Sequence, residues 1–248
     1  MILLKNKSEL ELMRAAGRIS NQALLVGGEA VKPGVSTAHI NRLIENYIRS
    51  QGAIPSFLGY GGFPASACIS INEQVIHGIP GDRIIEEGDI VSIDVGAYYK
   101  GFHGDNAATF GAGVISPEAR SLLEATKDSL YKGIEAATVG ARIGDVSFAV
   151  QNHVEQFGYG VVRSFVGHGV GKDMHESPEV PNYGKPGRGV RLAAGMTIAI
   201  EPMINIGTHE VKTLSDGWTV VTADGSLSAH FEHSIAITDN GPVILTQA

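Results

Sequence analysis

The sequence predicts an α+β fold built from two similar halves, each with two helices followed by strands. The same order of helical and strand-like segments occurs twice along the chain. In addition, Gly34 to Gly52 matches Gly140 to Gly158 at an offset of 106 residues, and Gly88 to Asp94 matches Gly195 to Glu201 at an offset of 107. Two nearly equal offsets indicate an internal duplication.

The first half begins with two segments in which apolar residues recur at helical spacing, from Ser8 to about Val26 and from Ser36 to Ser50. Ser8 with Glu11 three residues later predicts a capping box at the start of the first helix. From Ala67 to Phe110 the chain has short runs rich in Ile and Val, which indicate strands and hairpins.

The second half repeats this order. Pro117 to about Ala137 predicts a helix whose first turn suits the proline, and Gly144 to Phe157 predicts another. Strand-like patterns dominate from Val161 onward. We therefore expect the two halves to join in one curved sheet around a pseudo-twofold axis, with the functional site between them.

Length and composition suit one folded domain over residues 1–248, with halves of approximately 1–112 and 113–248. The net charge of -7 and the absence of a Lys/Arg run argue against a nucleic-acid function. A single cysteine, Cys68, fits a reducing compartment. No run approaches the ~20 apolar residues of a membrane span, so we expect a cytoplasmic protein with no membrane partner.

Four acidic residues share one pattern: each has small neighbours on its own strand face and branched apolar residues on the other. They are Asp94, Asp105, Glu201 and Glu232. Any one alone would fit a solvent-facing position equally well. Asp94 and Glu201, however, occupy equivalent positions of the repeat, which favours convergence. Converging acids repel one another, and bound cations relieve that repulsion.

A histidine between two glycines, His168, is a second candidate, because such a backbone can approach a ligand closely. A structural role would explain an isolated histidine equally well. The segment Gly167 to His175 does not match a phosphate loop, and the chain has neither a His-Glu-x-x-His zinc motif nor a Gly-x-Ser-x-Gly nucleophile elbow.

The motifs taken together resemble the signatures of type I methionine aminopeptidases, in order and over essentially the whole chain. They are Ile71–Pro80, Ser92–Gly96, Gly104–Asp105, Gly167–Gly169, Thr197–Pro202 and His230–His233. The resemblance implies the internally duplicated pita-bread fold. It also implies removal of the N-terminal methionine from nascent proteins and peptides, with a preference for a small second residue. The chain is most similar to the short bacterial form.

The resemblance also implies a dinuclear metal site. Two divalent ions, of Co, Mn, Fe or Zn, would be held by Asp94, Asp105, His168, Glu201 and Glu232. Asp105 and Glu232 would bridge the ions, and a hydroxide between the ions would attack the first peptide carbonyl. Glu201 would move the proton to the leaving amine.

Two further histidines take roles by resemblance. His175 would stabilise the oxyanion, and His77 would contact the substrate beyond the cleaved bond. The methionine pocket would consist of Phe57, Tyr60, Phe63, Cys68, Met174 and Trp218. Phe57 stands where some relatives have cysteine, and Met174 where some have phenylalanine. Core packing is an alternative explanation for Phe57 and Cys68.

Two other functions compete with this interpretation. One is an aminopeptidase P or prolidase, which usually carries an additional N-terminal domain. The other is a non-catalytic pita-bread binding protein, which typically loses metal ligands, whereas all five are present here. The implied partners are nascent polypeptide N-termini. The sequence leaves open the native metal, docking on the ribosome and the oligomeric state, for which we expect a monomer.

Overall fold

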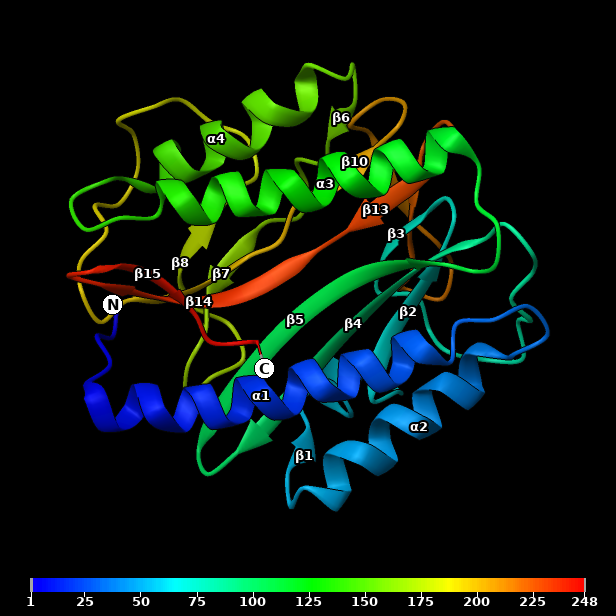
Figure 1. The fold of residues 1–248 in the computed structure, drawn as a ribbon, viewed down its shortest axis with the longest axis horizontal. Helices are drawn as coiled ribbons and strands as arrows, with labels where there is room; N and C mark the ends of the chain where they lie inside the picture. The colour runs from blue at the N-terminus through cyan, green and yellow to red at the C-terminus, as the bar shows by residue number, and fades with distance from the viewer. Residues whose placement is uncertain (1, 248) are drawn as a thin grey trace.

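The computed structural model describes residues 2–247 and contains four long helices (Figure 1). They are α1 (Lys7–Glu29), α2 (Thr37–Ser50), α3 (Pro117–Ala136) and α4 (Ile143–Glu155), with a short 3-10 turn, η1, at Tyr60–Gly62. Among the helices of residues 2–247, none combines the length and apolar composition needed to cross a lipid bilayer.

Within residues 2–247, nine strands form a central antiparallel sheet in the order β1-β4-β5-β14-β9-β7-β8, with β2 beside β4 and β15 beside β14. Their bounds are β1 (Ile54–Pro55), β2 (Ala67–Ile71), β4 (Ile90–Tyr99), β5 (Phe102–Gly111), β7 (Gly167–Gly169), β8 (Glu176–Val180), β9 (Thr197–Ile200), β14 (Glu232–Thr238) and β15 (Gly241–Ile244).

Two smaller antiparallel sheets of three strands each accompany the central sheet in this part of the chain, residues 2–247. One contains β13 (Ser228–His230), β10 (Met203–Asn205) and β6 (Gly160–Val161). The other contains β11 (Val211–Thr213), β12 (Val220–Thr222) and β3 (Gln74–Ile76). The duplicated α+β fold predicted from the sequence is therefore confirmed, with these smaller sheets added to it.

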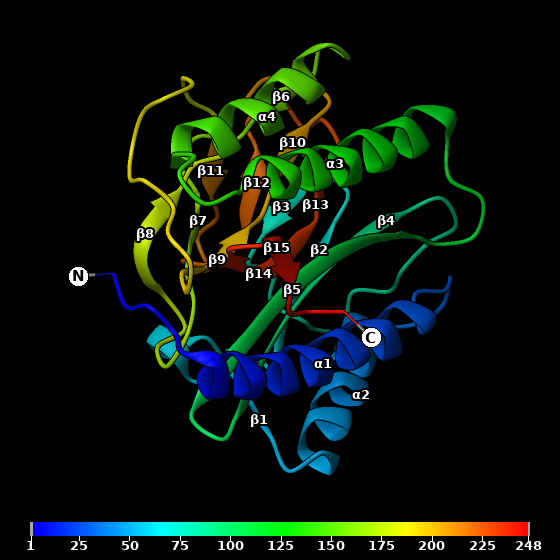
Figure 2. The same cartoon turned by 60° about the vertical axis from the view of Figure 1, so that its left-hand side comes forward.

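The helices cover the face of the sheet that carries the branched apolar side chains. Ile93 of β4 is buried in one cluster with Ile40 and Ile44 of α2, while Ile198 of β9 is buried in another with Leu130 of α3. In both views, α1 and α2 lie in the lower part of the picture, beside β4 and β5, and α3 and α4 lie in the upper part (Figures 1 and 2). Because strand side chains alternate between faces, Asp94, which follows Ile93, points away from the helices.

The duplication is repeated in backbone detail. Gly34 and Gly140 have φ of 88° and 89°, a left-handed conformation that glycine adopts without steric strain. Their N–H groups donate to the carbonyl oxygens of Ile85 and Leu192, both at 2.9 Å. The glycines are 106 residues apart and the carbonyls 107, which are the two offsets found in the sequence.

The predicted capping box at Ser8 and Glu11 is wrong, because the N-cap residue is Asn6, two residues before Ser8. The N–H of Glu9 donates to Asn6 Oδ1 at 3.1 Å, and the N–H of Asn6 donates to Glu9 Oε2 at 3.0 Å. Asn caps a helix as well as Ser does, and both pairs have the required spacing. The pair nearer the N-terminus forms the cap.

Helix α1 lies unusually close to β5, where Gly17 faces Gly104. A Cβ atom added at Gly104 would lie 2.5 Å from the Cα of Gly17 and 2.6 Å from the carbonyl carbon of Ala16. These are backbone atoms that no change of rotamer can move. The contact fixes the height of α1 above the strand that carries Asp105.

We expect Gly104→Ala to lower the free energy of unfolding by about 1–3 kcal/mol, because the added methyl group must push α1 off the sheet. Urea denaturation monitored by circular dichroism measures the change. Gly81→Ala is the matched control, since a Cβ at Gly81 meets nothing within 4 Å. Equal midpoints for both variants would show that the close contact is not required.

Candidate active site

The four acidic residues lie on neighbouring strands of the sheet. Asp94 is on β4, Asp105 is on β5 and Glu232 begins β14, and these strands are adjacent in that order. Glu201 follows directly after the last residue of β9, the next strand, so the expectation that all four lie within strands is wrong for Glu201. Antiparallel pairing therefore gathers acids that are far apart in the sequence.

Register brings these side chains to one point of the sheet. Ala107 of β5 pairs with Asp94 on one side and with Glu232 on the other. Asp105 is two residues from Ala107 and therefore lies on the same face. Both Asp105 and Glu232 are buried, at 3% and 2% exposure.

Burial and mutual repulsion make this cluster unfavourable without a cation. Burial raises the pKa of Asp94, Asp105, Glu201 and Glu232 well above their ordinary values, and neighbouring carboxylates add to the shift in all but Asp105. One carboxylate oxygen each of Asp94, Asp105 and Glu232 is buried without a hydrogen-bond partner. Buried polar atoms normally have partners, so these oxygens are free to bind a ligand.

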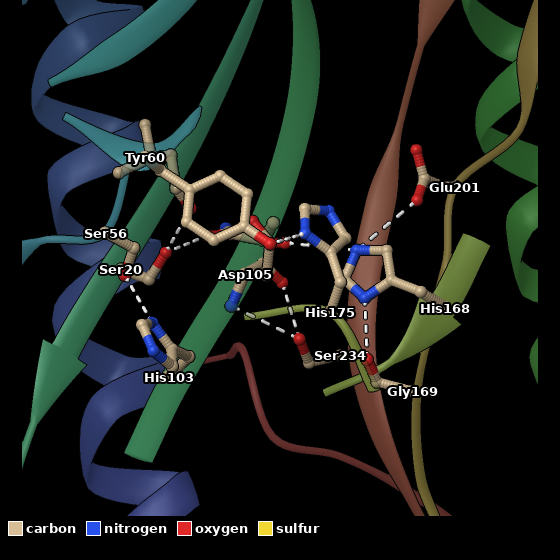
Figure 3. Close-up of polar contacts among 12 residues, drawn as sticks. Ser20, Ser56, Tyr60, His103, Asp105, His168, Gly169, His175, Glu201 and Ser234 are labelled. Carbon is tan, nitrogen blue, oxygen red and sulfur yellow. Dashed lines mark hydrogen bonds and ion pairs between the residues drawn. The ribbon is translucent and has the colours of Figure 1, made fainter. Parts of the chain in front are cut away.

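His168 of β7 completes the cluster. Its Nδ1–H donates to the carbonyl oxygen of Gly169 at 2.8 Å, which leaves the lone pair on Nε2. Nε2 lies 3.5 Å from Asp105 Oδ2 and 3.6 Å from Glu201 Oε1 (Figure 3). Burial lowers the pKa of His168, which keeps the ring neutral.

Ligand atoms of Asp105, His168 and Glu232 all lie within 4.8 Å of one another. Carboxylate oxygens with one imidazole nitrogen form a donor set that divalent transition metals accept. The residues present therefore fit a divalent metal ion.

Two more histidines face the cluster. The His175 ring meets that of His168 edge-on, with centroids 4.2 Å apart, and its Nδ1 is 2.7 Å from the hydroxyl of Tyr60 (Figure 3). His77 has a positive φ of 58°, which is rare for a non-glycine residue and concentrates at functional sites. Burial lowers the pKa of both His175 and His77 to about 4, so both rings are neutral at pH 7.

A cavity of about 160 Å³ contains these groups. A space of that order holds one group about as large as benzene. Its lining consists of Phe57, Tyr60, Phe63, Cys68, His77, Asp94, Asp105, His168, His175, Glu201, Trp218 and Glu232.

The structure thus brings together all the residues selected from the sequence, except that Met174 does not line the cavity. Met174 is 2% exposed and packs in one apolar cluster with Phe57, Phe63 and Cys68. It supports the wall from behind. Cys68 pairs with Asp94 across β2 and β4, so it lies at the boundary between the apolar wall and the acids.

Sequence reasoning missed His230. Its Nε2 atom is buried without a hydrogen-bond partner and lies 3.7 Å from Glu201 Oε2. Burial lowers the pKa of His230 to about 3, so the ring is neutral. Its spacing of two residues from Glu232 is the sequence signal that could have identified it.

Comparisons with known proteins agree with this site. The model of metallopeptidase family M24 matches residues 11–239. The methionine aminopeptidase of Clostridium acetobutylicum is 58% identical over 99% of each chain, and methionine aminopeptidase 1 of Bacillus subtilis is 52% identical over 100% of each.

Solved structures give the same result. The methionine aminopeptidase of Thermotoga maritima superposes with a TM-score of 0.98 at 45% identity, covering 100% of both chains. A prolidase from Pyrococcus furiosus superposes with a TM-score of 0.81 at 25% identity, and the match covers 99% of this chain and 65% of that one. Fold, acidic cluster and family model together define a metallopeptidase of the pita-bread type. The chain belongs to metallopeptidase family M24 and, within it, to the methionine aminopeptidases.

The acidic cluster should destabilise the metal-free fold. We expect Asp105→Asn to raise the stability of chelator-treated protein by about 1–3 kcal/mol, because a buried carboxylate is replaced by a neutral amide. The folded-state pKa of Asp105 is raised. The difference from wild type should therefore grow as the pH rises above the ordinary carboxyl value of ~4.

Thermal denaturation of both proteins, with and without Mn²⁺, measures this effect. Added metal should stabilise the wild type much more than Asp105→Asn. A chelated variant that is less stable than the chelated wild type at pH 8 would contradict the account.

Proposed function

We propose that this chain is a metal-dependent exopeptidase that removes the N-terminal methionine from nascent proteins and peptides. The observation that carries the proposal is one small cavity in which buried acids and an imidazole lie beside aromatic and apolar side chains. The acids provide a place for cations, and the apolar wall provides a place for one substrate side chain. Relatives named methionine aminopeptidase support this substrate.

Two divalent ions per chain are the proposed cofactors, of cobalt, manganese, iron or zinc. Asp105 and Glu232 are the proposed shared ligands, with Asp94 at one ion and with His168 and Glu201 at the other. The unpartnered oxygens of Asp94, Asp105 and Glu232 support this assignment. When bound, such ions polarise a carbonyl group and lower the pKa of water.

Proton transfer is the proposed role of Glu201. Its Oε1 atom lies 3.6 Å from His168 Nε2, and loss of contact with water followed by repulsion from Asp94 and Asp105 raises the pKa of Glu201. A carboxylate within hydrogen-bond reach of an attacking water can accept its proton and pass it to the leaving amine.

His175 is the proposed donor to the scissile carbonyl oxygen. Nδ1 of His175 lies 2.7 Å from the Tyr60 hydroxyl. The proposed tautomer is the one in which this hydroxyl donates to Nδ1 and the neutral ring carries its proton on Nε2. An N–H held in this way stabilises the negative charge that develops on the carbonyl oxygen.

Substrate preference follows from the two sides of the cavity. Phe57, Phe63 and Trp218 form an apolar wall against which a flexible thioether packs well. His77 lies edge-on to Phe165 and Trp218, with ring centroids 5.8 and 6.3 Å apart, and is the proposed contact for the substrate beyond the cleaved bond. The proposed preference at this side of the site is for a small second side chain. The proposed place of action is the cytoplasm, on newly made chains.

His175→Ala should lower kcat by ~10²–10³-fold, because one oxyanion donor is lost. The bound metal should remain, because His175 is not among the proposed ligands. Steady-state kinetics on a Met-Ala peptide and metal analysis of the same sample test both statements. His39→Ala is the control, because His39 is exposed on α2. Near-normal turnover of His175→Ala would make this histidine structural.

Peptides that differ only in the second residue test the specificity. We expect fast cleavage of Met-Ala, Met-Gly and Met-Ser peptides and slow cleavage of Met-Lys or Met-Phe peptides. A large side chain displaces the scissile carbonyl, and ~1 Å of displacement can lower the rate ~10²-fold. An N-acetylated peptide should remain intact, since its blocked amine cannot bind metal. Mass spectrometry after timed digestion measures the rates. Cleavage of an X-Pro peptide in preference to Met-Ala would favour the prolidase-like alternative.

A further inference from the structure

The segment that precedes α1 contacts the loop that carries His175 through a buried ion pair. The ammonium group of Lys5 contacts the Oε2 atom of Glu176, the residue that follows His175. Both side chains are almost fully buried, at 5% and 6% exposure. The pair joins residues 171 positions apart in the sequence.

The other carboxylate oxygen of Glu176 closes the loop on itself. Oε1 accepts hydrogen bonds from the backbone N–H of Lys172 at 2.9 Å and of Asp173 at 3.4 Å. One carboxylate therefore ties the start of the loop to its end, where β8 begins. His175 and Met174 lie between these two attachment points.

Lys5 is itself held in place. Its backbone N–H donates to the carbonyl oxygen of Gly195 at 2.7 Å, and its ammonium group also donates to the carbonyl oxygen of Leu3 at 3.2 Å. A Cβ added at Gly171 would lie 2.3 Å from Glu176 Oε1 and 2.7 Å from Lys5 Nζ. The loop therefore packs directly against the ion pair.

Stability alone does not account for this arrangement, because a buried ion pair is often no better than a well-packed apolar pair. Loss of one partner, in contrast, leaves an unpaired buried charge, which is strongly unfavourable. Without Lys5, the Glu176 carboxylate would have to turn toward water and release the N–H groups of Lys172 and Asp173. The turn that holds His175 would then lose its fixed shape.

We propose that Lys5 is a positioning residue for the reaction, and that the Lys5–Glu176 pair holds the loop of residues 170–175 so that His175 meets the scissile carbonyl. The inference rests on the proposed function, since it assigns the pair a role in placing the oxyanion donor. Lys5 acts through Glu176 and the loop, and does not itself contact the substrate.

The test compares Lys5→Met with wild type on a Met-Ala peptide. We expect kcat to fall roughly 10- to 100-fold, because small displacements of a catalytic group are costly. KM should change by less than about 3-fold, since most of the pocket wall lies on other elements. Metal content should be unchanged. Hydrogen exchange measured by mass spectrometry should become faster in the peptide that covers residues 170–176.

A double variant, Lys5→Met with Glu176→Met, separates positioning from stability. It removes the unpaired charge, so its melting temperature should return toward the wild-type value. It cannot restore the hydrogen bonds to Lys172 and Asp173, so kcat should stay low. Lys172→Met is the matched control. It removes an exposed ion pair with Glu9, at 3.6 Å, and leaves the loop N–H groups intact, so kcat should stay within about 2-fold.

Wild-type kcat in Lys5→Met, or recovery of kcat together with stability in the double variant, would overturn the positioning role. A rise in KM at constant kcat would also overturn it. If wild-type protein itself fails to cleave the Met-Ala peptide with metal present, the proposed function fails instead.

Discussion

The repulsion among four buried carboxylates is the constraint on which the rest of the structure depends. Asp105 and Glu232 are buried, Asp94 and Glu201 are partly buried, and loss of contact with water raises the pKa of each. No lysine or arginine is among the described residues that line their cavity. A fold that keeps such a cluster must hold it rigidly, and a covered sheet does so. The helices pack on one face, and the acids project from the other.

The duplication explains how one sheet supplies acids from distant parts of the chain. Asp94 and Glu201 occupy equivalent positions 107 residues apart, on β4 and at the end of β9. Between these two strands lie β5 and β14, which carry Asp105 and Glu232. The two residues proposed to bind both metal ions, Asp105 and Glu232, therefore lie on these two central strands. The other proposed ligands lie on β4, at the end of β9 and on β7.

Features of the fold that depend on short-range sequence patterns could be predicted from the sequence. Alternation in the strands placed the acids opposite Ile93 and Ile198, and the repeated segments predicted the order of helices and strands in each half. Spacing alone could not identify the capping box of the first helix, because Asn6 with Glu9 and Ser8 with Glu11 are both three residues apart. In the structure, Asn6 and Glu9 form it.

Contacts between distant segments could not be predicted in this way. Lys5 and Glu176 look like ordinary surface residues in the sequence, yet tertiary packing buries them as a pair. His230 was likewise left unassigned, because its approach to Glu201 depends on how β13 meets the end of β9. Met174 was placed in the pocket wall by resemblance, and in the structure it supports that wall from behind.

Metal binding to the purified, chelator-treated protein tests the central claim most directly. Equilibrium dialysis against Mn²⁺, with metal analysis of the protein, gives the number of ions bound per chain. We expect saturable binding of about two ions per chain. Asp105 and Glu232 can each bind both ions, while Asp94 binds one ion and His168 and Glu201 bind the other. Saturation at one ion would contradict the proposed dinuclear site. The absence of saturable binding would contradict the whole explanation of why these acids are buried together.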